Sequence, residues 1–402
     1  MIDPAAPIVM PTAAVPLVSL LIPTTNQSVK LAACLRSLAT HLPPGVPCEI
    51  IVVLNAATEE VRHLVRHGCT GLKIAESEAN LGVAGGYNRA RSLATGEFLV
   101  LLHDDVEIGP GWLEPLLATA ATHPAAGAIG SRTFNSDGTP QRAGSILWRN
   151  GLNSPAEPPA EHPDAPWPVD YCGTCAMFVR TALWDALGGL DEEIYPAYFV
   201  DVDLCMGLRR LGAIVLCDPD STLRHHSRSS SPKPFRDFFV ARNHVYFLHK
   251  WADALKAYEP WSDNDQDSLS RAFQQTKQTA EELSARWQPI APAAAPPHDP
   301  IRQEIRHFQL AAALAEAWSR HLMERAEAAE AKVAFRKQEN IQLREKLKAR
   351  DRKVANLRAH RERLRAELGD AGQPGPWQRL GRWWRNRLSP RPPASGPAAP
   401  PP

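Results

Sequence analysis

The sequence lacks a long apolar run, an excess of charge of one sign and an N-terminal export signal. No stretch approaches the roughly 18 apolar residues that a membrane-spanning helix requires. The formal net charge is +1, so no overall electrostatic attraction to nucleic acid is expected. The N-terminus has no basic region followed by an uninterrupted apolar one, because prolines divide it. We therefore expect a cytoplasmic protein without a nucleic-acid partner.

Regular cysteine spacing is also missing. Seven cysteines at irregular intervals in 402 residues favour a reducing compartment over a disulfide framework. Cys172 and Cys175 have CxxC spacing, but no second such pair completes a zinc site, so packing roles are favoured for both. A GxGxxG fingerprint is absent, which disfavours a dehydrogenase that uses a nicotinamide dinucleotide.

Short apolar runs alternate with helical patterns through the first 120 residues. The runs at 18–22, 49–54 and 72–75 are continuous rather than alternating. Continuous runs are typical of strands buried on both faces of a parallel sheet that helices cover. The predicted fold class is therefore α/β, with a mostly parallel sheet flanked by helices.

The stretch Leu99–Ile108 is predicted to be a further buried strand that carries Asp104 and Asp105 at its carboxyl end. Ligands of open α/β sheets bind at that end. Two adjacent carboxylates are costly unless a cation or strong donors hold them, so a metal site is indicated.

Beyond residue 108 the pattern becomes mixed. The expected elements are a helix opened by Pro110, two strands at 128–134 and 145–148 around a turn at 135–138, a strand at 169–179, a helix at 201–211 and short extended pieces at 214–217 and 223–226.

The two ends differ in composition from the middle. Residues 1–15 are predicted to be a disordered leader and 251–300 a linker with some helix. Residues 301–368 contain no glycine or proline and are predicted to form a long helix or coiled coil, with a single solvated helix as the alternative. The seam positions are Val333, Asn340, Leu347, Val354, Arg361 and Leu368, and Leu322, Ala329, Arg336, Leu343, Arg350, Leu357 and Leu364.

The last segment, 369–402, combines a basic tryptophan-rich stretch with a Pro/Ala tail. Residues 377–388 hold four arginines and three tryptophans, which favours a weak anchor on an anionic membrane. A packing hook or a disordered tail is the alternative. A coiled coil would make the protein a homodimer, and this stretch would place it at the inner membrane face.

Five motifs in one α/β unit carry a resemblance. They are PTTN (23–26), EIIVVLN (49–55), NLGVAGGYN (80–88), LLHDDV (101–106) and FVDVDLCMGLRRLG (199–212), the last followed by LRHH (223–226). With GGLDE (188–192) and RNHVYFLHK (242–250), their order and spacing resemble family-2 glycosyltransferases of the GT-A fold over about 16–250.

The resemblance implies an inverting transferase that moves a sugar from a nucleotide-diphosphate donor to a hydroxyl of a glycan or a lipid-linked acceptor, in cell-surface polysaccharide synthesis. Asp105 aligns with the metal-binding aspartate and His225 with a metal-binding or diphosphate-binding histidine, which implies Mn²⁺ or Mg²⁺. Asp201 aligns with the catalytic base. A base is needed because the acceptor hydroxyl must lose its proton as the new bond forms.

The resemblance also implies a set of substrate-binding residues. They are Pro23, Thr24, Asn26, Asn55, Asn80, Gly82, Gly85, Asn88, His103, Asp104 and Asp203. Structural roles remain open for Asp104 as a hydrogen-bonding residue, for Asp203 as a carboxylate at a helix N-terminus and for His225 as a loop histidine.

Three positions depart from the family pattern. Leu54 replaces an aspartate that contacts the nucleobase, His103 replaces the first residue of the DxD motif, and Val200 replaces a glutamate. These departures support an alternative, a non-catalytic GT-A-like protein that binds a sugar nucleotide or acts as a coiled-coil scaffold.

Overall fold

The computed structural model describes residues 7–158, 163–226, 232–262, 265, 267–292, 295 and 298–368. The chain forms two compact units, 1–319 and 320–402. The strands are β1 (Ile8–Val9), β2 (Val18–Thr24), β3 (Cys48–Asn55), β4 (Cys69–Thr70), β5 (Leu72–Ser77), β6 (Phe98–Leu102), β7 (Val106–Ile108), β8 (Ala126–Phe134), β9 (Pro140–Arg142), β10 (Ser145–Leu147), β11 (Asn153–Pro155), β12 (Trp167–Pro168), β13 (Ala176–Arg180) and β14 (Ile214–His225). The helices are α1 (Ser28–His41), α2 (Glu59–His67), α3 (Gly82–Arg91), α4 (Leu113–Thr122), α5 (Thr181–Leu187), α6 (Val200–Arg210), α7 (Lys233–Lys250), α8 (Ala252–Leu255), α9 (Ser268–Arg286) and α10 (Pro300–Leu368).

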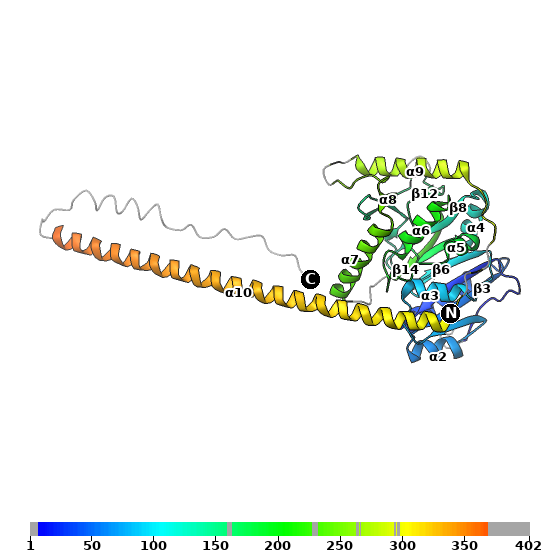
Figure 1. Ribbon diagram of the computed structural model, residues 1–402, viewed down its shortest axis with the longest axis horizontal. Helices are drawn as coiled ribbons and strands as arrows, with labels where there is room; N and C mark the ends of the chain where they lie inside the picture. Colours follow the sequence, from blue (N-terminus) through cyan, green and yellow to red (C-terminus); the bar gives the residue numbers. More distant parts are fainter. Residues whose placement is uncertain are drawn as a thin grey trace. The chain divides into compact units, whose positions relative to one another are not determined.

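A single large sheet organises the first unit (Figure 1). Its strand order is β12-β14-β8-β13-β6-β2-β3-β5, with β7 paired to β14 and β9 to β8. The strands β6, β2, β3 and β5 are parallel, whereas β13 runs antiparallel between β6 and β8. The predicted α/β class is confirmed: the sheet is parallel in its first half and mixed in the second.

Two hydrophobic cores lie on opposite faces of the sheet, and alternate residues of β6 point into each. Leu99 and Leu101 belong to the core that includes residues of α3, α5 and α6. Val100 and Leu102 belong to the core that includes residues of α1, α2 and α4. Full burial of one such side chain contributes about 1.5–3 kcal/mol, which explains why this strand is apolar without alternation.

The predicted strand over Leu99–Ile108 is two strands joined by a turn. β6 ends at Leu102, and His103 to Asp105 form the turn before β7. β7 leaves β6 and pairs antiparallel with β14, so that Val106 lies opposite His225. The correction matters for the site because this pairing brings His225 next to the aspartate turn.

Other elements also differ from the expectations. The helix expected at Pro110 begins at Leu113, and 145–147 pairs with 153–155 rather than across the turn at 135–138, where β9 is the partner of β8. Of the expected strand at 169–179, only the part from Ala176 onward is a strand, and this strand, β13, continues to Arg180. The two extended pieces at 214–217 and 223–226 are one strand, β14, which has an irregularity between Asp218 and Thr222.

The leader predicted to be disordered and the linker predicted to contain some helix both include ordered elements. β1 pairs with β4, and Ile8 and Met10 are buried, so the leader is not disordered at these positions. α9 occupies part of the expected linker and buries Ala272, Thr276 and Ala280, which recur every four residues on one face. The helix expected within the linker is thus located at 268–286, and its buried face consists of small side chains.

The second unit contains the rest of α10. The predicted helix over 301–368 is confirmed, and its large apolar side chains between 320 and 363 are exposed. Seam residues Leu364 and Leu368 lie outside the side chains that the structure describes, and 369–402, with the stretch 377–388, lies outside the described residues. Of the helices in the described part of the chain, none is both long and apolar enough to cross a membrane.

Candidate functional site

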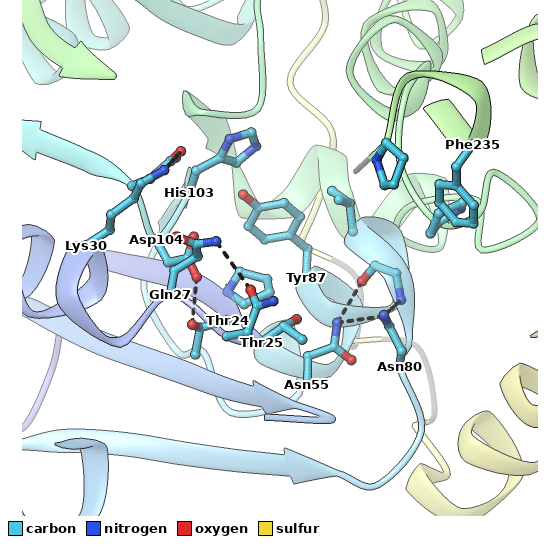
Figure 2. Close-up of a pocket in the computed structure, with 17 residues that line it drawn as sticks. Thr24, Thr25, Gln27, Lys30, Asn55, Asn80, Tyr87, His103, Asp104 and Phe235 are labelled. Carbon is cyan, nitrogen blue, oxygen red and sulfur yellow. Dashed lines mark hydrogen bonds and ion pairs between the residues drawn. The ribbon is translucent and has the colours of Figure 1, made fainter. Parts of the chain in front are cut away.

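A cavity of about 540 Å³ opens at the carboxyl ends of β2, β3 and β6 (Figure 2). Residues before and within α1, the loop into α3, the turn after β6 and the start of α7 form its walls. The lining residues are Pro23, Thr24, Thr25, Asn26, Gln27, Lys30, Asn55, Asn80, Gly82, Val83, Tyr87, His103, Asp104, Asp105, Pro196, Pro232 and Phe235. Most of the predicted substrate-binding residues therefore share one cavity.

The two aspartates of the turn have different surroundings. Asp104 Oδ2 accepts a hydrogen bond of 2.6 Å from Thr24 Oγ1, yet burial raises the pKa of Asp104 to about 6. Burial would also raise the pKa of Asp105, but the hydrogen bond and charge of His225 and the nearby positive charges lower it to about 2. Asp105 is thus the more acidic of the two carboxyl groups, while Asp104 begins to take up a proton just below neutral pH.

Asp105 and two histidines form a cluster with the geometry of a metal site. Ligand atoms of His103, Asp105 and His225 all lie within 4.8 Å of one another. Burial lowers the pKa of His103 to about 4, which keeps its imidazole neutral and able to bind a metal. The sequence predicted Asp105 and His225 as metal ligands, whereas His103 was assigned to the substrate. The structure brings His103 into the cluster because His103 follows β6 in the turn that leads to β7. β7 in turn pairs with β14, which carries His225.

The orientation of His225 supports a cation at this point. Gln141 Oε1 accepts a hydrogen bond of 2.8 Å from His225 Nδ1, and the Gln141 amide nitrogen donates to Asn135 Oδ1, which fixes the amide. The other ring nitrogen, Nε2, lies 3.2 Å from Asp105 Oδ1. A lone pair and a carboxylate oxygen at this distance need a proton or a metal ion between them. Gln141 carried no sequence signal, because it reaches the site from β9.

The donor set determines which ions fit. Two imidazole nitrogens and one carboxylate oxygen suit a transition ion such as Mn²⁺, whereas Mg²⁺ is held mainly through oxygen ligands. The residues present therefore fit a divalent transition ion.

Lys30, which was not among the residues predicted from the sequence, lines the cavity on the side of Asp105. Lys30 Nζ in α1 lies 3.5 Å from Asp105 Oδ2 and donates a hydrogen bond of 3.0 Å to the carbonyl of His226. Lys30 stands one helical turn after Asn26 of the PTTN motif, and that spacing was the available signal.

Asn55 and Asn80 shape the opposite wall (Figure 2). Asn55 Oδ1 accepts a hydrogen bond of 2.7 Å from the Leu81 amide, and its Nδ2 donates to the Gly82 carbonyl at 3.2 Å. Gly82 has φ +64°, and a Cβ there would lie 2.7 Å from the Pro196 carbonyl oxygen. Asn55 lines the cavity, but its side chain already holds the glycine-rich loop.

Three predicted substrate residues do not line the cavity. Gly85 faces α10, where a Cβ would lie 3.0 Å from the His307 ring. Asn88 donates to the Leu190 carbonyl and to Glu192, both at 2.8 Å. Asp203 is buried and accepts hydrogen bonds from Lys250 Nζ and Trp251 Nε1. These contacts give all three a structural role.

Asp201 lies at the start of α6, outside the cavity lining. Tyr198 and Phe199 just before it have φ values of 69° and 68°, a strained conformation that is costly for non-glycine residues. Burial raises the pKa of Asp201 against the opposing charge of Arg142. Burial also raises the pKa of Cys175 to about 12. The negative charges of Asp201 and Asp105 both add to this rise, so the two carboxylates lie near the same thiol.

Comparisons with known proteins agree with this geometry. The family model described as glycosyl transferase family 2 matches residues 19–187. The O-antigen biosynthesis protein RfbC of Myxococcus xanthus is 28% identical over 189 residues, which cover 43% of this chain and 14% of that protein. The N-acetylglucosaminyl-diphospho-decaprenol L-rhamnosyltransferase of Mycobacterium tuberculosis is 26% identical over 223 residues, 48% of this chain and 70% of that enzyme.

Among solved structures, GalNAc-T7 with UDP, GalNAc and Mn²⁺ aligns with a TM-score of 0.51 and 14% sequence identity, covering 68% of this chain and 56% of that chain. This likeness shows the fold, which confirms the predicted GT-A type. This chain spans about one seventh of the length of the Myxococcus relative, 14%. Residues 19–187 therefore match the glycosyl transferase family 2 model, and the chain carries a domain of the GT-A fold with its candidate site at the strand ends.

Proposed function

We propose that this protein is an inverting, metal-dependent glycosyltransferase that moves a hexosyl or deoxyhexosyl group from a nucleotide-diphosphate donor to a saccharide or lipid-linked acceptor. The observation that carries the proposal is the cluster of His103, Asp105 and His225 at the end of a cavity of nucleotide size. A divalent ion held there would neutralise the diphosphate and stabilise the leaving nucleotide.

The chain's own residues divide the remaining work. Thr24, Asn26 and the loop held by Asn55 would bind the nucleoside part, since they line the cavity beyond the aspartate turn. Asp201 would accept the proton of the acceptor hydroxyl, and its raised pKa makes it a stronger base than an exposed aspartate. Its Oδ1 accepts a hydrogen bond from the Val202 amide, which orients the carboxylate.

The relatives support the acceptor class. The names of the two matched proteins place one in O-antigen biosynthesis and one in rhamnosyl transfer to a decaprenol-linked acceptor. We therefore infer a role in cell-surface polysaccharide synthesis, at the cytoplasmic face where lipid-linked acceptors are extended. The exposed apolar seam of α10 would pair with a second copy in a coiled-coil homodimer, and 377–388 would touch the membrane.

Turnover of UDP-, dTDP- and GDP-sugars with and without Mn²⁺ tests the proposal. We expect Mn²⁺-dependent release of nucleotide from at least one donor. Asp105→Ala should abolish release and Asp201→Asn should lower kcat by about 10²–10⁴-fold. Asp253→Asn serves as the matched control because Asp253 is almost fully exposed on α8, with only an ion pair to Lys256. Donor binding without turnover, unchanged by Asp201→Asn, would instead support a sugar-nucleotide-binding scaffold.

A further inference from the structure

Lys30 brings a positively charged side chain to the wall of the cavity. Among the described residues that line it, no other is a lysine or an arginine. Its side chain is 28% exposed, so the ammonium group is accessible from the cavity while it contacts Asp105. Figure 2 shows Lys30 extending from α1 on the side of the aspartate turn.

The negative charge expected at this wall exceeds what one divalent ion would neutralise. Asp104 and Asp105 place two carboxylates there, and the diphosphate of a sugar nucleotide would bring about two further negative charges. One divalent ion on Asp105 offsets only part of this total. An ammonium group that donates to a phosphate oxygen supplies the rest and forms a charge-assisted hydrogen bond.

The present contacts of Lys30 are of the kind that a donor could replace. The distance of 3.5 Å from Nζ to Asp105 Oδ2 is at the limit of a hydrogen bond, and the shorter contact is to a backbone carbonyl. A divalent ion on Asp105 would repel an ammonium group at this distance. The flexible lysine stem lets the group turn toward a diphosphate without moving α1.

We propose that Lys30 is a diphosphate-binding residue that exchanges partners: it pairs with Asp105 before the donor binds and donates to a phosphate oxygen of the donor afterwards. The proposal rests on the proposed function, because it requires a nucleotide-diphosphate ligand in this cavity. It predicts that removing the charge weakens nucleotide binding without weakening the binding of the metal alone.

Isothermal titration of the full chain with Mn²⁺ alone, and then with UDP, dTDP and GDP in the presence of Mn²⁺, tests the exchange. In Lys30→Met, Mn²⁺ alone should bind as tightly as in the wild type or up to about tenfold more tightly, because a competing cation is gone. The diphosphate that binds the wild type should bind about 10–100-fold more weakly, since a charge-assisted hydrogen bond is lost. Lys30→Arg should retain most of the affinity, and Lys256→Met controls for loss of a remote surface charge.

Two results would overturn the proposal while leaving the proposed function intact. One is unchanged diphosphate affinity in Lys30→Met. The other is weaker binding of Mn²⁺ alone, because Lys30 would then act by holding Asp105 in place. If the wild type binds none of the three diphosphates, the proposed function and this proposal both fail.

Discussion

Replacing Gln303 by alanine should destabilise the GT-A domain, although Gln303 lies in α10, beyond the region that resembles the family. Gln303 is 7% exposed and accepts a hydrogen bond of 2.9 Å from Arg89 Nε. Its Nε2 donates to Glu192 Oε1 at 2.7 Å and to the Gly85 carbonyl at 3.2 Å. The first turns of α10 thereby connect the glycine-rich helix to the loop that leads to Asp201.

The magnitude follows from these partners. Two of the three hydrogen bonds involve charged groups, and each such bond contributes about 1.5–3 kcal/mol when buried. Arg89 keeps bonds to the carbonyls of Glu76 and Pro300, and Glu192 keeps its bond from Asn88, which reduces the loss. We expect a decrease of about 2–4 kcal/mol in the free energy of unfolding.

Urea unfolding followed by tryptophan fluorescence measures this change. Arg306→Ala is the matched control, because Arg306 lies one turn away and forms a half-exposed ion pair with Glu193. Such a pair contributes about 0–1 kcal/mol. Equal stability losses in Gln303→Ala and Arg306→Ala would refute the reasoning, because the buried hydrogen bonds of Gln303 would then contribute no more to stability than an exposed ion pair.

Four further predictions follow from the site and its surroundings. Gln141→Leu should weaken Mn²⁺ binding about 10–100-fold in a calorimetric titration, with an unchanged circular dichroism spectrum, because His225 loses the acceptor that orients it. His103→Asp should raise the activity with Mg²⁺ relative to Mn²⁺, and an unchanged ratio would exclude His103 as a ligand. Burial would raise the pKa of Asp191, but Lys250 and other donors lower it below the value in the unfolded chain. The ionised Asp191 therefore contributes its full stability above the unfolded pKa, and this stability is lost as the pH falls through the folded pKa. Between about pH 6 and pH 3 the wild type should lose more stability in urea unfolding than Asp191→Asn, and parallel pH curves would contradict this prediction. Removal of 320–402 should convert a dimer to a monomer in light scattering, and an unchanged mass would contradict the coiled coil.

Local sequence patterns were sufficient for the half of the sheet that holds the site. β3 and β6 are buried throughout and β2 at every residue except Pro23, so each strand shows in the sequence as a short continuous apolar run. The two carboxylates that follow the apolar run mark where ligands would bind, but the sequence predicted one strand through Ile108 and did not reveal the turn between β6 and β7.

Contacts between distant segments were not accessible in this way. His103 and His225 meet because β7 pairs with β14, and a pattern of burial does not reveal which strands pair. Gly85 and Asn88 have the spacing of a ligand loop, yet their partners are His307 and Glu192, far along the chain. The helix expected in the linker could not be given bounds from the sequence, because alanine and threonine form the buried face of α9.

The pairing of β7 with β14 also limits which changes of length this domain can accept. A deletion or insertion of one residue between Thr222 and His225 would put Arg224 or His226 opposite Val106 and turn the histidine to the other face of the strand. The irregularity between Asp218 and Thr222 lies upstream of that stretch and already takes up unpaired residues. We expect natural length variation in β14 to collect between Asp218 and Thr222, because changes there leave the spacing of His103, Asp105 and His225 unaltered.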